Sequence, residues 1–255
     1  MSPRGGRDVS EGRNGHEGYE GYGVRPDRTG QAEAFDAIGA RYDQAYPHKE
    51  GQLAAGRWLI ESLPAGSRIL DVGCGTGLPT ARQLTDTGHS VVGVDLSTGM
   101  LELAARNVPE AELLHRDVAS LRAEGPGGLG RFDAITCFFT LLMLPRDEIP
   151  YALRQFHRLL EPGGLLALSM VEAELDDTEI PFLGHTVRVS GFLRDELRRV
   201  VCETGFEIAG ESSYAYAPES NQASPSSRLP STGGTPVSRG DPIPEHQLFL
   251  NCRRT

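Results

Sequence analysis

The stretch that decides the fold is Ile69-Leu70-Asp71-Val72-Gly73-Cys74-Gly75-Thr76-Gly77, where a short apolar run leads into three alternating glycines. The apolar run, residues 68–72, predicts a buried strand. The glycines predict a sharp turn into a helix that continues to about residue 87. Glycines at such a turn let a ligand approach the main chain, and the free N–H groups of the following helix point toward that ligand. The stretch therefore predicts a ligand site at the carboxyl end of a strand.

The spacing of the glycines separates this turn from the dinucleotide-binding turn, whose pattern is G-x-G-x-x-G. Here Gly73, Gly75 and Gly77 alternate, and the next residue is Leu78. Asp71 stands just before the turn, where its carboxylate would repel a pyrophosphate and attract the ammonium group of an amino acid. The turn therefore favours an amino-acid moiety over a diphosphate, which weakens the hypothesis of an NAD oxidoreductase.

Outward from the turn, apolar strands alternate with amphipathic helices. Strands are expected over 68–72, 90–95, 111–114, 132–138, 165–171, 206–215 and 246–252. Further helices are expected over 31–46, 50–63, 98–107, 146–160 and 192–203. Repeated β-α-β units with near-continuous apolar strands predict an α/β fold with a doubly wound, mainly parallel sheet covered on both faces.

Two stretches have compositions that cannot bury enough surface to offset their ordering entropy. Residues 1–30 are rich in glycine and charge, and we expect a disordered tail there. Residues 218–245 are rich in proline and serine, and we expect a flexible loop. Because the apolar run 246–252 follows it, this loop interrupts a single domain that spans 31–255.

Composition excludes several classes of protein. The 255 residues carry a formal net charge of −10, which disfavours a nucleic-acid partner, because such partners usually meet a basic face. The four cysteines form no C-x-x-C pair, so we expect neither a zinc site nor a redox pair. With no long apolar stretch and no signal-like N-terminus, the sequence predicts a cytoplasmic protein without a membrane segment.

Two further aspartates follow strands near the glycine turn. Asp95 ends the second strand, where a carboxylate can accept hydrogen bonds from both hydroxyls of a ribose. Asp117 follows the third strand and could accept a hydrogen bond from the exocyclic amine of adenine, while the N–H of Val118 donates to a ring nitrogen. Alone, each aspartate is as well explained as a cap or a turn residue; together with the glycine turn they indicate an adenosine site.

With these residues in view, the chain resembles the class I S-adenosylmethionine-dependent methyltransferases over 32–217 and 246–253. Residues 69–77, 91–97 and 115–118 are similar to the first three motifs of that family, and segments 132–135 and 160–165 also match. The resemblance is closest to the small-molecule branch of quinone-type and bacterial secondary-metabolite enzymes. It implies a Rossmann-like fold with a seven-stranded sheet whose last strand, 246–252, is antiparallel.

The resemblance also implies S-adenosyl-L-methionine as cofactor and assigns residues to its parts. Leu96 and Met100 would pack near the adenine, Cys137 and Phe138 would lie near the sulfonium, and Tyr42 would close over the methionine portion. The full implied set is Tyr42, Asp71, Gly73, Cys74, Gly75, Asp95, Leu96, Met100, Asp117, Val118, Cys137 and Phe138.

The implied reaction is in-line transfer of an activated methyl group to a small-molecule acceptor, where a protein base is optional. No base is assigned. Candidates by position are His48, Lys49, Glu172, Glu174, His185 and Tyr214, each better explained by a solvated or structural role. The acidic run 175–179 is expected to be a solvated loop rather than a metal site. An alternative from another class is a module that binds S-adenosylmethionine without transferring methyl, either regulatory or cyclase-like.

Overall fold

The computed structural model describes residues 28–216 and 245–255. The expected tail and the expected proline-rich loop lie almost wholly outside these residues. The exception is the end of the tail: Arg28 is buried, and α1 (Thr29–Ile38) begins at the next residue. Residues 28–30 of the expected tail are therefore part of the folded structure.

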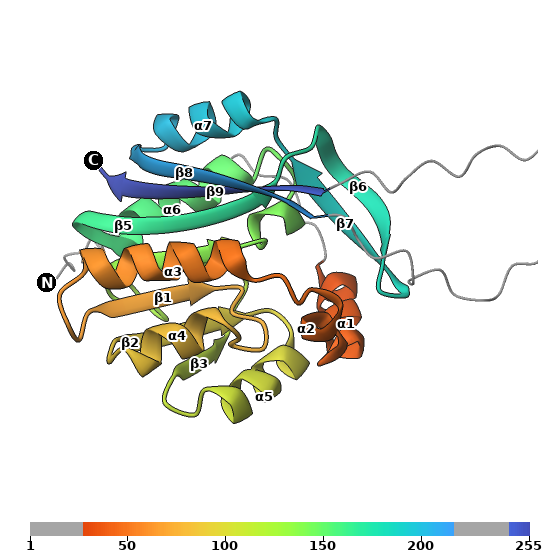
Figure 1. Cartoon of the computed structure of the whole chain (residues 1–255), viewed down its shortest axis with the longest axis horizontal. Helices are drawn as coiled ribbons and strands as arrows, with labels where there is room; N and C mark the ends of the chain where they lie inside the picture. The colour runs from red at the N-terminus through yellow and green to blue at the C-terminus, as the bar shows by residue number, and fades with distance from the viewer. Residues whose placement is uncertain (1–27, 217–244) are drawn as a thin grey trace, which may run out of the picture.

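A seven-stranded sheet forms the centre of the molecule, with the strand order β3-β2-β1-β4-β5-β9-β8 (Figure 1). Its strands are β1 (Arg68–Val72), β2 (Ser90–Asp95), β3 (Glu112–His115), β4 (Phe132–Phe138), β5 (Leu160–Val171), β8 (Phe206–Tyr216) and β9 (Glu245–Arg254). The strands from β3 to β5 pair in parallel, whereas β9 pairs antiparallel with both β5 and β8. The predicted mainly parallel sheet with an antiparallel last strand is thus confirmed.

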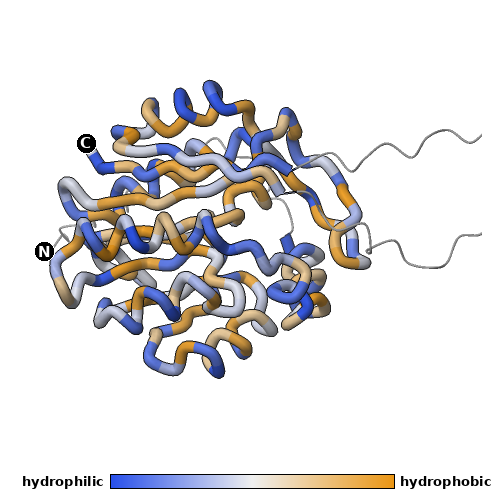
Figure 2. Tube along the Cα trace, viewed as in Figure 1, coloured by the Kyte–Doolittle hydropathy of each residue, from blue (hydrophilic) through white to orange (hydrophobic). Residues whose placement is uncertain are grey.

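Helices cover both faces of this sheet. The two packed clusters place α3 (Glu50–Ser62) and α4 (Thr80–Asp86) on one face, and α6 (Ile149–Leu159) and α7 (Arg194–Glu203) on the other. The alternation of strand side chains separates the clusters, since Ile69 packs with α3 and α4 while Leu70 packs with α6. Along the trace, apolar residues follow the strands and polar ones recur along the helices (Figure 2). Within the described ranges, no helix has the length and apolar character needed to cross a membrane.

The helix expected over 31–46 is two helices, α1 and α2 (Arg41–Ala45). Gly39 separates them, and its φ of 51° lies in the left-handed region that glycine tolerates. The resulting corner lets the segment fold over the carboxyl ends of the strands. In Figure 1, α1 and α2 stand at the end toward which the β1 arrow points.

The largest departure from expectation concerns residues 175–191. The acidic run expected to be a loop instead opens a β-hairpin of β6 (Leu175–Phe182) and β7 (His185–Gly191), which forms a separate two-stranded sheet. In β7, Val187 and Val189 are buried while Thr186 and Arg188 are exposed. This period of two is the signature of a half-buried strand. The short helices α5 (Thr98–Asn107), η1 (Val118–Ser120) and η2 (Leu141–Met143) complete the fold.

Candidate active site

A cavity of about 460 Å³ lies at the carboxyl ends of β1, β2 and β4. The helices α1 and α2 and the β6–β7 hairpin contribute lining residues opposite those strand ends. Of the twelve residues implied by the family resemblance, all but Cys137 line this cavity. The carboxyl ends of parallel strands lie at one edge of the sheet, which is why Asp71 and Phe138, 67 positions apart in the sequence, both line this cavity.

The glycine turn after β1 forms one wall of the cavity. All three glycines have positive φ, at 68° for Gly73, 53° for Gly75 and 78° for Gly77. A Cβ added to Gly73 would lie 2.0 Å from Thr140 Oγ1, and one added to Gly77 would lie 2.8 Å from Val108 Cγ2. A Cβ on Gly75 would meet nothing within 4 Å. Gly75 therefore lines open space, and its lack of a side chain leaves the main chain accessible to a ligand.

Asp71 contributes to the same wall a buried carboxylate oxygen that has no hydrogen-bond donor among the described residues. Its side chain is only 3% exposed. Oδ1 accepts a hydrogen bond from Thr136 Oγ1 at 2.7 Å, whereas Oδ2 is buried with no hydrogen-bond partner among the described residues. Burial raises the pKa of this carboxyl group to about 7. A buried carboxylate oxygen without a donor is costly, so this position suits a cationic donor from a ligand.

Asp95, the last residue of β2, is hydrogen-bonded to the glycine turn that follows β1. Its Oδ2 accepts from the N–H of Gly75 at 2.9 Å, and its Oδ1 accepts from the N–H of Ser97 at 2.9 Å. Burial raises the pKa of this carboxyl as well. Each carboxylate oxygen has a second lone pair, and Asp95 lines the cavity beside Leu96 and Met100. The two fixed oxygens thus remain able to accept hydrogen bonds from a diol.

Asp117 and its neighbour Val118 line the same cavity. Its Oδ1 caps η1 by accepting from the N–H of Ala119 at 2.8 Å, and its Oδ2 accepts from Arg28 Nη1 at 2.8 Å. Arg28 itself lines the cavity. Sequence reasoning missed Arg28 because it fell within the stretch expected to be a tail, and no local pattern marks its partner 89 residues away.

Cys137 is the implied residue that the fold places elsewhere. Its side chain is fully buried in the core cluster on the α6 face, and it is absent from the cavity lining. The reason is the alternation of side chains along β4, which places Cys137 on the opposite face of the sheet from its two neighbours. Of these neighbours, Thr136 contacts Asp71 and Phe138 lines the cavity. The side chain of Phe138 thus lines the cavity and that of Cys137 does not, and the place of Cys137 near a bound sulfonium stays a prediction.

The segment formed by α1 and α2 is tied to two of the strand-end loops. Asp36 Oδ1 accepts from Ser97 Oγ at 2.5 Å and from the N–H of Gly99 at 2.8 Å. Asp43 Oδ2 accepts from Thr76 Oγ1 at 2.6 Å, in the glycine turn. Tyr42 lines the cavity between these contacts, and burial raises the pKa of its phenol, which stays neutral. We call this segment, residues 28–46, the lid.

The opposite wall is apolar and comes mainly from the hairpin. The ring of Phe182 packs against Phe35, Tyr42 and Tyr46 of the lid, with centroid distances of 6.0, 6.4 and 5.7 Å. Further apolar residues that line this part are Phe139, Met143, Val171, Leu175, Ile180, Pro181, Val187 and Val189. Sequence reasoning missed the part of this wall that the hairpin supplies, although the alternation of Val187 and Val189 was a usable signal.

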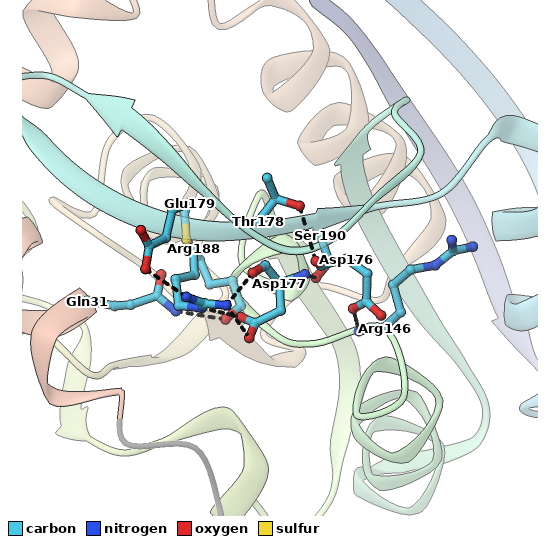
Figure 3. A network of polar contacts seen from close by, with 9 residues as sticks. Gln31, Arg146, Asp176, Asp177, Thr178, Glu179, Arg188 and Ser190 are labelled. Carbon is cyan, nitrogen blue, oxygen red and sulfur yellow. Dashed lines mark hydrogen bonds and ion pairs between the residues drawn. The ribbon is translucent and has the colours of Figure 1, made fainter.

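A network of polar contacts holds the hairpin in place (Figure 3). The Arg188 guanidinium donates to both carboxylate oxygens of Asp177 at 2.8 Å and to Glu179 Oε1 at 2.8 Å. The N–H of Asp177 donates to Ser190 Oγ at 2.8 Å, and the N–H of Arg146 donates to Asp176 Oδ1 at 2.9 Å. These acids therefore serve strand pairing and attachment. In the part of the chain that the structure describes, no group of three His, Cys, Asp or Glu side chains gathers as a metal site would require.

The candidate bases divide into two groups. His48 and Lys49 line the cavity, and Lys49 Nζ lies 3.3 Å from Asp43 Oδ1. The other candidates, Glu172, Glu174, His185 and Tyr214, are not among the lining residues. Glu172 pairs with Arg194 at 3.1 Å, and Tyr214 packs edge-on against Phe249 at 5.6 Å, so both have structural roles.

A family of known proteins matches the segment that contains the glycine turn. Residues 69–164 match the family model described as a methyltransferase domain. A dTDP-3-amino-3,6-dideoxy-alpha-D-glucopyranose N,N-dimethyltransferase of Streptomyces fradiae is 32% identical over 150 residues, covering 57% of this chain and 55% of that protein. The chain thus matches little more than half the length of this relative.

Solved structures share the fold at lower identity. The 1,6-didemethyltoxoflavin-N1-methyltransferase of Burkholderia thailandensis, solved with S-adenosylhomocysteine, is 20% identical with a TM-score of 0.58, covering 88% of this chain and 87% of that one. The cyclase SpnF is 20% identical with a TM-score of 0.61, covering 88% and 95%. Residues 69–164 therefore match the methyltransferase-domain family, and the chain shares the fold of solved S-adenosylmethionine-dependent methyltransferases.

Proposed function

We propose that this protein is an S-adenosylmethionine-dependent methyltransferase that acts on a small molecule by direct in-line methyl transfer. The observation that carries the proposal is the unpartnered, buried Oδ2 of Asp71 beside the open main chain of Gly75. A carboxylate oxygen without a donor at the edge of a cavity suits an ammonium group, and the glycine leaves room for the chain that bears it. The amino-acid end of S-adenosylmethionine has both features.

The remaining strand-end residues would hold the adenosine part. Asp95 would accept from the ribose hydroxyls, and Leu96 and Met100 would pack against the base. Asp117 would accept from the exocyclic amine, and the N–H of Val118 would donate to the ring. Their common place in one cavity supports these roles. Gly73, Cys74, Phe138 and Tyr42 would line the methionine and sulfonium end.

Bound S-adenosylmethionine supplies a methyl group already activated by its sulfonium. What remains for the chain is to place the acceptor in line and to exclude water, and positioning alone can contribute roughly 7–11 kcal/mol. The lid and the hairpin meet through the Phe182 contacts on the acceptor side. His48 and Lys49 are the candidate bases that line the cavity, and neither is needed for an acceptor that is already ionised.

A small apolar or aromatic acceptor fits the wall opposite the glycine turn. Aromatic and aliphatic side chains dominate that wall, and the cavity lies beneath the lid rather than on an open basic surface. The Streptomyces fradiae relative is named for a sugar nucleotide, and the Burkholderia thailandensis protein for a small heteroaromatic molecule. We expect no nucleic-acid acceptor, in keeping with the net charge of −10.

Calorimetric titration with S-adenosylhomocysteine and NADH tests the cofactor. We expect binding of S-adenosylhomocysteine, weakened roughly 10–100-fold in Asp95→Ala, the loss for a hydrogen bond to a charged group. Asp86→Ala, at an exposed carboxylate on α4, is the matched control and should bind as wild type. Tighter binding of NADH would overturn the proposal.

Turnover separates a methyltransferase from a binding module. Release of S-adenosylhomocysteine is measured across a panel of phenols, amines and carboxylic acids. We expect release that depends on one class of acceptor. Cofactor binding without turnover on any acceptor would favour the alternative of a module that binds S-adenosylmethionine without methyl transfer.

A further inference from the structure

Arg28 is buried at the adenosine end of the cavity, where no sequence motif placed it. Its side chain is 7% exposed. The guanidinium donates through Nη1 to Asp117 Oδ2 at 2.8 Å and through Nη2 to Glu148 Oε2. Its main-chain carbonyl accepts from the N–H groups of Gln31 and Ala32, both at 3.1 Å, which fixes the residue to the first turn of α1.

Three elements far apart in the sequence converge on this guanidinium. Asp117 immediately precedes η1, Glu148 immediately precedes α6, and Arg28 immediately precedes α1. The partners are 89 and 120 residues away from Arg28. Burying a guanidinium costs free energy unless carboxylates pair with it, so such a triad forms only when all three segments are in place. Arg28 thereby ties the start of the lid to the loop that carries Asp117.

The charge of the triad bears on what Asp117 can recognise. Two carboxylates and one guanidinium leave one negative charge at the end of a cavity that both Arg28 and Asp117 line. Such a carboxylate favours a ligand that presents an N–H donor and disfavours one that presents a carbonyl oxygen. Without the guanidinium, Asp117 and Glu148 would repel each other, and Asp117 would keep only its hydrogen bond from Ala119.

We propose that Arg28 is a positioning residue for adenine recognition, which acts by fixing the Asp117 carboxylate and by fastening the lid over that end of the cavity. This inference rests on the proposed function, since it takes adenine to be the group at Asp117. It assigns cofactor selectivity to a residue at the N-terminal edge of the described chain. Arg28 is not a catalytic residue, because the methyl group is transferred at the opposite end of the site.

The test compares two ligands that differ at one position of the base. S-Adenosylhomocysteine carries the exocyclic amine, whereas S-inosylhomocysteine carries a carbonyl oxygen there. Binding of both is measured by calorimetry for the full chain as wild type, Arg28→Ala and Arg28→Lys. Arg41→Ala, at an exposed arginine of the same lid that lies outside the cavity, is the matched control.

We expect wild type and Arg41→Ala to prefer S-adenosylhomocysteine by roughly 10–100-fold, the range for one hydrogen bond to a charged group. Arg28→Ala should bind S-adenosylhomocysteine at least ~10-fold more weakly and lose most of that preference. Arg28→Lys, which keeps the charge without the two-armed geometry, should fall between. Because a ratio of affinities is measured on folded protein, partial unfolding of a variant does not imitate this result.

An unchanged preference in Arg28→Ala would overturn the inference and leave the proposed function standing. Wild-type protein that binds neither ligand would overturn the proposed function, and the inference with it. Equal weakening of both ligands in Arg28→Ala would also contradict the inference, because it would show that Arg28 closes the lid without influencing the base.

Discussion

The carboxyl group of Asp71 should make cofactor binding depend on pH in the range just below neutrality. Burial raises its pKa to about 7, and its Oδ2 awaits a donor. Only the ionised form can pair with an ammonium group. The ionised fraction rises from ~9% at pH 6 to ~50% at pH 7, so the apparent affinity for S-adenosylhomocysteine should rise about fivefold. The α-amino group of the ligand stays protonated over this interval, since even the α-amino group of a peptide titrates only near ~7.7–8.0 and that of a free amino acid titrates higher.

Calorimetry at pH 6.0, 6.5 and 7.0 measures this slope. 5′-Methylthioadenosine, which lacks the amino-acid end, is the ligand control and should bind with the same affinity at each pH. Asp71→Asn should bind S-adenosylhomocysteine roughly 10–100-fold more weakly at pH 7 and without the slope. A flat profile for the wild-type protein, or the same slope with 5′-methylthioadenosine, would refute the assignment of Asp71 to the ammonium group.

Three further outcomes follow from the same geometry. A carboxyl pKa raised to about 7 destabilises the ligand-free fold progressively from about pH 4 to pH 7, by about 4 kcal/mol in full at ~1.4 kcal/mol per pKa unit. Asp71→Asn should remove this charge and stabilise the ligand-free protein at pH 8 by up to that amount. Thermal unfolding at pH 8 and pH 4 measures this, and an equal gain at both values would contradict it. Gly75→Val should abolish cofactor binding while lowering the free energy of unfolding by only ~1–2 kcal/mol, because of the positive φ at this position. Gly73→Val, whose side chain would clash with Thr140, should lower the free energy of unfolding by several kcal/mol more, as chemical denaturation would measure. Phe182→Ala should raise the KM for the acceptor about tenfold and change the KM for S-adenosylmethionine by less than ~2-fold. The control Leu193→Ala, at an exposed apolar residue, should change neither KM. A matching rise in the KM for S-adenosylmethionine would show that Phe182 serves the cofactor instead.

The cofactor half of the cavity could be predicted from the sequence because its determinants are local. A buried strand that runs into alternating glycines defines its own turn, and Asp95 and Asp117 follow strands whose carboxyl ends must share an edge in a parallel sheet. The mainly parallel sheet followed from the alternation of strands and helices, whereas the antiparallel last strand was implied by the family resemblance. What this reasoning could not fix was the face of β4 on which Cys137 lies, since that depends on the register of the strand against its neighbours.

The hairpin wall of the cavity and Arg28 could not be found in this way because they depend on distant partners. Residues 175–179 look like a solvated acidic loop until Arg188 and Ser190, more than ten residues later, supply their donors. Arg28 looks like part of a glycine-rich tail until Asp117 and Glu148 pair with it. In both places the local composition indicated a loop or a tail, whereas ion pairs and hydrogen bonds to residues far away in the sequence hold the segment in an ordered structure.

The hairpin is a sheet of its own, attached beside the seven-stranded one rather than hydrogen-bonded into its ladder. Substitutions at its inward positions can therefore reshape the apolar wall of the cavity, where we propose that the methyl acceptor binds, while the strands under the glycine turn keep their register. The sequence of the hairpin can thus vary while the sequence of the seven-stranded sheet stays constant. Recombining β6–β7 segments from other sequences onto this chain is accordingly a direct route to altered acceptor range.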